Sequence, residues 1–171
     1  MRFAIQILLL GVFAFSTESA YAFCYEEAGN RYGISPTLLH AISKGESSFN
    51  PAAINYNTNG SYDFGLMQIN SLWAPSLRKH GIPWEFLADP CTNVMVGAWV
   101  LSQCIRDYGN TWPAVGCYNS RTPSKRDRYA ARIARIVRQE QPHQRFEQIA
   151  IITDTSKVTP WEEAFGIVAS R

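Results

Sequence analysis

The chain has 171 residues, a net charge of +2, and a composition that is 46% hydrophobic and 13% aromatic. A chain of this length can form one domain that buries about two-thirds of its unfolded surface. The nearly balanced charge says little about partners. Nucleic acid is a poor candidate partner, because the basic surface is a single predicted helix with no binding motif beside it.

Residues 1–22 have the pattern of a signal peptide. Arg2 supplies the basic start, an apolar run extends from Phe3 to Phe15, and Ala20-Tyr21-Ala22 offers small residues for cleavage. The run is shorter than the ~20 residues of a membrane span, and no later segment supplies one. We therefore expect an exported, soluble, periplasmic protein with no integral membrane span.

The four cysteines all follow the predicted signal peptide: Cys24, Cys91, Cys104 and Cys117. An oxidising compartment favours disulfides among them, and four cysteines allow three pairings. A zinc site is the alternative, but there is no C-x-x-C pair and the three histidines are scattered. We expect disulfides, no metal and no cofactor.

The first mature segments predict two helices, residues 24–32 ended by Gly33, and a second from Pro36 to about Gly45 with Ser35 as its cap. The second helix has an apolar stripe that includes Leu39 and Ile42. Continued by one turn, this stripe reaches Glu46 at the helix end.

Glu46 is thus directed toward apolar surroundings and lies at the negative end of a helix dipole. Both effects raise the pKa of a carboxyl toward the value that a general acid needs. The alternative is a glutamate exposed at a fraying helix end, and the spacing alone does not decide between them.

The stretch from Ala52 to Phe64 is rich in asparagine, glycine and tyrosine, which predicts turns with a short hairpin at Asn59-Gly60. We expect this stretch to form one wall of a cleft. Tyr62 can offer a flat aromatic face to a ligand, although packing is the ordinary role of such a residue. Asp63 is a second carboxylate close to Glu46 in the sequence.

The remainder of the chain predicts helices. Pro75 and Pro83 separate two short helical turns between Ser71 and Ala88. Three longer helices then follow, at Cys91–Tyr108, from Trp112 onward with Thr111 as its cap, and at Ser124–Gln139. The last helix places Arg128, Arg132, Arg135 and Arg138 on one face, which indicates a solvated basic face or attraction to an anionic polymer.

Three ordered motifs resemble the lysozyme-like lytic transglycosylases that cleave peptidoglycan: E-S-S-F-N-P at 46–51, G-L-M-Q-I-N at 65–70 and G-C-Y-N-S at 116–120. The resemblance covers about Cys24 to Gln139. It is strongest to small members that accompany conjugative transfer, type IV secretion and invasion-type secretion systems. The motifs depart from the family pattern at Cys117 and at Ser120-Arg121, where small residues are usual.

The resemblance implies an α+β, predominantly helical, lysozyme-like fold with a small hairpin and disulfides. It favours Cys24 with Cys91, and we expect Cys104 with Cys117 as a local addition. Implied site residues are Glu46 as the catalytic acid, with Ser47, Met67, Gln68, Tyr118 and Asn119 around the substrate, and with Tyr62 and Asp63 as further candidates.

The family cleaves the bond between N-acetylmuramic acid and N-acetylglucosamine with one carboxyl group and releases a 1,6-anhydro sugar. If Asp63 faces Glu46 across the groove, a hydrolytic, goose-type muramidase is the alternative. A second alternative is a non-catalytic wall-binding assembly module. The motifs of zinc proteases, of serine hydrolases and of phosphate-binding loops are missing from the sequence.

The expected organisation is a signal peptide at 1–22, the catalytic domain at 23–141 and a C-terminal extension at 142–171. Extensions of this kind are commonly mobile. Its apolar groups, at Ile149–Ile152 and around Trp161 and Phe165, are candidates for contact with secretion or conjugation components.

Overall fold

The computed structural model describes residues 18–140, so the predicted signal peptide lies largely outside the described residues and the C-terminal extension entirely so. The elements in chain order are α1 (Glu18–Tyr32), α2 (Pro36–Ser47), β1 (Ile54–Tyr56), β2 (Tyr62–Phe64), β3 (Ile69–Asn70), η1 (Ser71–Trp73), α3 (Ala74–Lys79), η2 (Trp84–Ala88), α4 (Pro90–Tyr108), α5 (Trp112–Asn119) and α6 (Pro123–Glu140). The predicted fold class, mostly helical with a small antiparallel sheet and disulfides, is confirmed.

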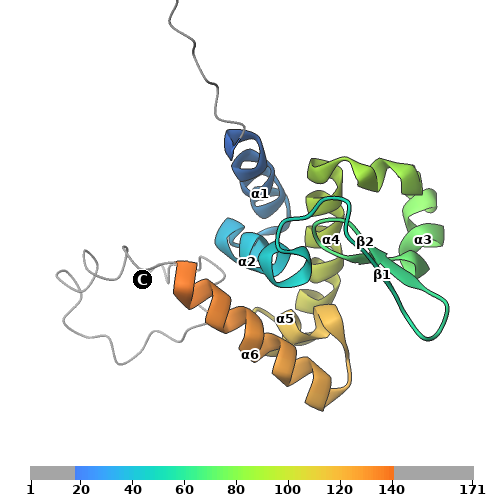
Figure 1. The fold of residues 1–171 in the computed structure, drawn as a ribbon. Helices are drawn as coiled ribbons and strands as arrows, with labels where there is room; N and C mark the ends of the chain where they lie inside the picture. Colours follow the sequence, from blue (N-terminus) through green and yellow to red (C-terminus); the bar gives the residue numbers. More distant parts are fainter. Residues whose placement is uncertain (1–17, 141–171) are drawn as a thin grey trace, which may run out of the picture.

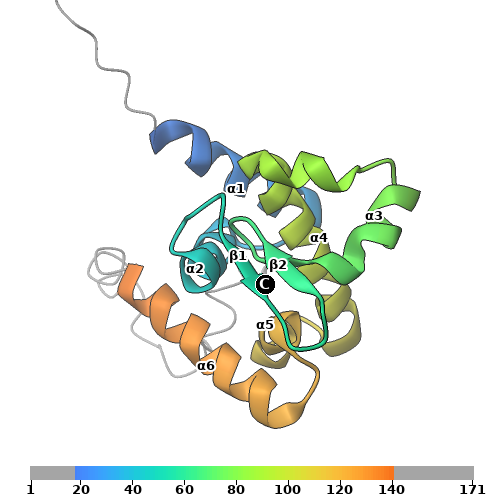
Figure 2. The ribbon, with the colours of Figure 1, turned by 45° about the vertical axis from the view of Figure 1, so that its right-hand side comes forward.

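The longest helix, α4, runs through the middle of the domain (Figure 1). It packs against α1, α2 and α5, while α6 lies against α2 and α5. Both views show the sheet at a level between α1 and α6 (Figure 2). The apolar faces of α2, α4 and α6 meet in one core, where Leu39, Ile42, Leu101 and Ile133 are fully buried.

Proline residues and capping side chains define where the helices begin. Proline stands in the first turn of α2, α4 and α5, where its missing N–H costs no hydrogen bond. Asp89 caps α4 by accepting from the Thr92 N–H, and Thr111 caps α5 by accepting from the Ala114 N–H. The side-chain cap predicted for Ser35 was wrong, because this residue makes no such bond and only its carbonyl starts α2.

The sheet contains three short antiparallel strands in the order β1-β2-β3. The predicted hairpin is confirmed: Tyr56 pairs with Tyr62, and Gly60 in the turn has a φ of 81°. Asp63 pairs with Asn55 on one side and with Asn70 on the other. Successive residues of β2 point to opposite faces, so Tyr62 and Asp63 serve different surfaces.

Two disulfides join the cysteines, Cys24 with Cys91 and Cys104 with Cys117, which confirms the expected pairing. The first ties α1 to the start of α4, and the second ties α4 to α5. Among residues 18–140, no helix combines the length and the apolar character needed to cross a membrane.

Candidate active site

A groove of about 760 Å³ lies between the end of α2, the sheet and the α5–α6 side of the domain. Five of the predicted site residues line it: Glu46, Asp63, Gln68, Tyr118 and Asn119. They come from four different places in the chain: α2, β2, the loop before β3 and the last turn of α5. The groove therefore unites all three sequence motifs.

Glu46 lies in the last turn of α2, with 16% of its side chain exposed. The helix continues two residues beyond the predicted end at Gly45 and stops at Ser48, whose φ of 51° is left-handed. The stripe of Leu39 and Ile42 is fully buried, as the spacing required. Glu46 continues this stripe to the rim of the core, where the carboxyl meets the groove.

Burial is the largest influence on the Glu46 carboxyl and raises its pKa above the usual value. The nearby Tyr129 hydroxyl and the positive charge of Arg132 lower the pKa, and the negative charge of Asp63 raises it. The net pKa shift is upward. Glu46 therefore stays protonated to a higher pH than a hydrated glutamate, which suits a general acid.

Two tyrosines lie beside this carboxyl. The Tyr118 hydroxyl donates to the Met67 carbonyl at 2.7 Å. The Tyr129 hydroxyl is buried and makes no hydrogen bond within residues 18–140. It nevertheless lies close enough to Glu46 to lower the pKa of that carboxyl. The two rings stack with centroids 6.4 Å apart. Burial raises the pKa of both phenols well above the usual value, so both remain donors at neutral pH.

Arg132 reaches from α6 to the C-terminal turn of α2. It donates to the Gly45 carbonyl at 2.7 Å, and its second nitrogen lies 3.4 Å from the Glu46 carboxyl. Its guanidinium also lies 4.9 Å from the centre of the Tyr129 ring. Because the pair is partly solvated, its main effect is on the charge state of Glu46 rather than on stability.

The loop from Gly65 to Gln68 depends on Asn93 of α4. Asn93 is buried; its side-chain oxygen accepts from the Met67 N–H at 2.8 Å, and its amide nitrogen donates to the Phe64 and Leu87 carbonyls at 3.2 Å. Gly65 has a φ of 81°, and a Cβ there would lie 2.1 Å from the Asn93 amide nitrogen. This position therefore requires glycine.

Gln68 lines the groove, but its amide is engaged within the protein. It donates to the Gly65 carbonyl at 2.8 Å and to the Ala53 carbonyl at 3.1 Å, and it accepts from Asn55 at 2.6 Å. These bonds hold the residue at a φ of 49°, which a non-glycine residue rarely adopts. The arrangement ties the loop to β1.

Three other predicted site residues lie outside the groove lining. Met67 is fully buried behind the groove, where Ser43 donates to its sulfur, so it supports the wall from within. Ser47 donates to the Leu66 carbonyl at 2.9 Å and joins α2 to the loop. Tyr62 packs edge-on against Trp84 on the opposite face of the hairpin from Asp63.

Asp63 both lines the groove and is hydrogen-bonded to neighbouring asparagines. It lines the groove close enough to Glu46 to raise the pKa of that carboxyl. It also accepts from Asn70 at 2.7 Å and from Asn57 at 3.0 Å, so each of its oxygens has an amide partner.

Sequence reasoning missed several residues of the site. Asn93 is a buried amide in a helix whose other buried residues are mostly apolar, which is a signal that could have identified it. Tyr129 and Arg132 belong to one helix for which the sequence predicts no role in the site, yet both influence Glu46. Leu72 and Trp73 also line the groove, as does Lys125.

Comparison with known proteins identifies a family that this chain matches. Residues 23–135 match the family described as Transglycosylase SLT domain. The invasion protein IagB of Salmonella typhimurium is 42% identical over 130 residues, which span 73% of this chain and 81% of that protein. Protein IpgF of Shigella flexneri is 44% identical over 104 residues, 60% of this chain and 68% of that one. The X polypeptide of Escherichia coli is 40% identical over 120 residues, 66% and 71% of the two chains.

The fold resembles the X-ray structure of an inactive mutant of the lytic transglycosylase Slt from Pseudomonas aeruginosa. The TM-score is 0.55 and the sequence identity 21%, over 73% of this chain. The match spans 24% of that longer protein, so this likeness concerns the fold.

The family match contains every residue that lines the groove, from Glu46 to Lys125. The two disulfides indicate a protein that folds outside the reducing cytoplasm. With two-thirds of the sequence matched, the chain belongs to the Transglycosylase SLT domain family and is a peptidoglycan lytic transglycosylase.

Proposed function

We propose that the protein cleaves the β-1,4 bond between N-acetylmuramic acid and N-acetylglucosamine in peptidoglycan and leaves a 1,6-anhydro end. The observation that carries this proposal is the Glu46 carboxyl, partly buried at the end of α2 and open to the groove. Cleavage needs a proton for the departing oxygen, and Glu46 is the groove carboxyl whose pKa is raised.

In the proposed reaction Glu46 does two jobs in turn. It first gives its proton to the glycosidic oxygen as the bond to the anomeric carbon breaks. The carboxylate then takes the proton of the 6-hydroxyl of the same sugar while that oxygen bonds to the anomeric carbon. The acetamido group of the substrate assists at the positive centre. Glu46 ends protonated, ready for another cycle.

The surroundings of Glu46 support both charge states. Burial favours the neutral acid, which must exist before cleavage. The Tyr129 hydroxyl and the Arg132 guanidinium favour the carboxylate, which forms after the proton has left. A phenol with no other partner in residues 18–140 is free to donate to that carboxylate when it appears.

The state of Asp63 favours the anhydro product over hydrolysis. A goose-type muramidase needs a second carboxylate to activate water, but both Asp63 oxygens accept from asparagine amides. Digestion of purified peptidoglycan followed by mass spectrometry tests this. We expect products lighter by one water than those of hydrolysis, and products of full mass would establish the muramidase instead.

The alternative of a non-catalytic wall-binding module is tested by zymography of the purified protein. A binder has no use for a carboxyl whose pKa is raised by burial beside two phenol donors. We expect a cleared zone in a peptidoglycan gel. Retention on the wall without clearing would support the module.

We further propose that this activity opens the periplasmic wall locally for a secretion or conjugation apparatus. The support is the likeness to IagB, which is named an invasion protein. A strain lacking the gene should lose transport, and the wild-type gene should restore it where the Glu46→Gln gene does not. Full restoration by both genes would separate transport from wall cleavage.

The pH dependence should report the charges around Glu46. Because the acid form is active, the rate falls as pH rises through the pKa of Glu46. Arg132→Gln removes a charge that lowers this pKa, so the alkaline limb of kcat/KM should move to higher pH. Asp63→Asn removes a charge that raises the pKa, so the limb should move to lower pH. Shifts in the same direction for both variants would show that another group controls the limb.

A further inference from the structure

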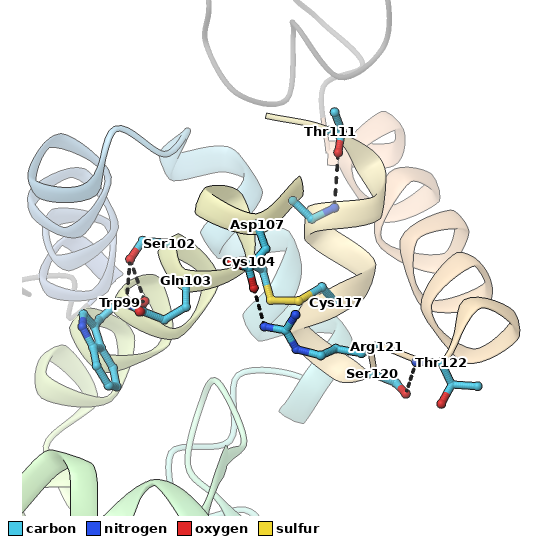
Figure 3. Close-up of a disulfide and its surroundings, with 11 residues drawn as sticks. Trp99, Ser102, Gln103, Cys104, Asp107, Thr111, Cys117, Ser120, Arg121 and Thr122 are labelled. Carbon is cyan, nitrogen blue, oxygen red and sulfur yellow. Dashed lines mark hydrogen bonds and ion pairs between the residues drawn. A yellow bond between two sulfur atoms is a disulfide. The ribbon is translucent and has the colours of Figure 1, made fainter. Parts of the chain in front are cut away.

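The residues in which the third motif departs from the family pattern form a cross-link between α4 and the end of α5. Cys117 is bonded to Cys104, and Arg121 is paired with Asp107 at 2.5 Å (Figure 3). Cys104 and Asp107 lie three residues apart on α4 and therefore on one face of it. We name the Cys104–Cys117 bond together with the Asp107–Arg121 pair the clasp.

The clasp encloses the groove residues of α5. Cys117 directly precedes Tyr118 and Asn119, which line the groove, and Arg121 follows two residues later. From its other side, α5 is fixed by close packing on α6, because a Cβ at Gly116 would lie 2.3 Å from the Arg126 carbonyl oxygen. The turn that carries Tyr118 is thus held from both sides.

The covalent part of the clasp carries most of this restraint. The Asp107–Arg121 pair is solvent-exposed, and exposed ion pairs contribute little. The guanidinium of Arg121 also lies 5.9 Å from the Tyr108 ring centre. A helix of eight residues such as α5 is not stable by itself, so its position depends on what it is attached to.

The position of Tyr118 matters to the site. Its hydroxyl donates to the Met67 carbonyl at 2.7 Å and so joins α5 to the loop that forms the groove floor. Its ring stacks on Tyr129, the phenol beside Glu46. Small displacements of such groups lower turnover more than they lower stability.

We propose that Cys104 and Cys117 are positioning residues for Tyr118 and Asn119, so that full wall-cleaving activity requires the disulfide between them. This inference rests on the proposed function. In the reducing cytoplasm both residues are thiols, and the clasp is incomplete. Export to an oxidising compartment, where the two thiols give up two protons and two electrons to a disulfide oxidant, completes it.

The main experiment compares two paired replacements, Cys104→Ala with Cys117→Ala and, as the matched control, Cys24→Ala with Cys91→Ala. The second pair removes a disulfide that lies outside the groove lining. Each protein is assayed on purified peptidoglycan well below its own Tm, with the folded fraction verified by circular dichroism. We expect kcat to fall about tenfold in the first variant with KM less affected, and kcat to be retained in the control.

A double-mutant cycle separates positioning from a merely structural role. If the clasp acts through Tyr118, opening it should cost little further activity in a Tyr118→Phe background, and the two losses should not add. In the control variant, reduction by dithiothreitol should lower kcat in step with the appearance of two thiols, and reoxidation should restore it. This reversible step needs no further substitution and stands if the first variant folds poorly.

Unchanged kcat in the folded Cys104→Ala, Cys117→Ala variant would overturn the inference. Fully additive losses in the cycle would overturn it too, since the clasp would then act elsewhere. An oxidised wild-type protein without activity would contradict the proposed function itself, so the two failures are distinguishable.

Discussion

Replacing Glu46 by glutamine should lower the turnover of peptidoglycan by a factor on the order of 10² to 10⁴. Glutamine keeps the size and polarity of the side chain but has no acidic proton for the departing oxygen, and it cannot later accept the proton of the 6-hydroxyl. The measurement is release of soluble muropeptides by the purified variant. Glu27→Gln, an exposed change on α1, should leave turnover unchanged.

The same substitution should not unfold the protein. The pKa of Glu46 is raised in the folded state, so the carboxyl favours folding below its unfolded pKa, and this contribution is lost as pH rises through the folded pKa. Above its unfolded pKa the partly buried carboxyl therefore costs stability, and glutamine removes this cost. The Tm of the variant at pH 7 should equal or exceed that of the wild type. Full turnover by a folded Glu46→Gln protein would end the proposed mechanism.

Replacing Asn93 by leucine should cost the fold about 3 to 5 kcal/mol, because it leaves several buried backbone groups without partners. The Met67 N–H loses its acceptor, and the Phe64 and Leu87 carbonyls lose their donor. Leucine is close in size, so the loss is one of hydrogen bonds rather than of volume. For a domain of this size we expect a fall in Tm on the order of 10 °C.

Chemical denaturation of the Asn93→Leu variant gives the free energy of unfolding directly. Asn30→Leu is the matched control, since Asn30 is exposed on α1, and it should change stability by no more than about 0.5 kcal/mol. Turnover should fall as well, because Met67 and Gln68 lie on the loop that Asn93 holds. Equal effects of the two substitutions would show that the loop is maintained by other contacts.

Local sequence signals determined the helices of this protein and much of the path of its chain. Pro36, Pro90 and Pro113 begin helices, and Asp89 and Thr111 cap them, because these effects act within one turn. The stripe of Leu39 and Ile42 directed Glu46 to the rim of the core for the same reason. The motif order supplied the family, and the expected cysteine pairs are those of the structure.

The surroundings of Glu46 were decided only by tertiary structure. Tyr129 and Arg132 come from a helix more than eighty residues later, and no local pattern shows that α6 packs on the end of α2. The same holds for Asn93, whose partner Met67 lies in a loop 26 residues earlier, and for the asparagines that donate to Asp63.

The helix stripe and the ordered motifs of the sequence together thus indicated which carboxyl could be an acid, and the stripe could do so because burial along a helix is a periodic, local property. Only the tertiary structure decided which groups shift the pKa of that acid and which neighbouring carboxylate is already hydrogen-bonded. Electrostatic and hydrogen-bond effects depend on distances of a few ångströms, and packing brings those atoms together without regard to their separation along the chain.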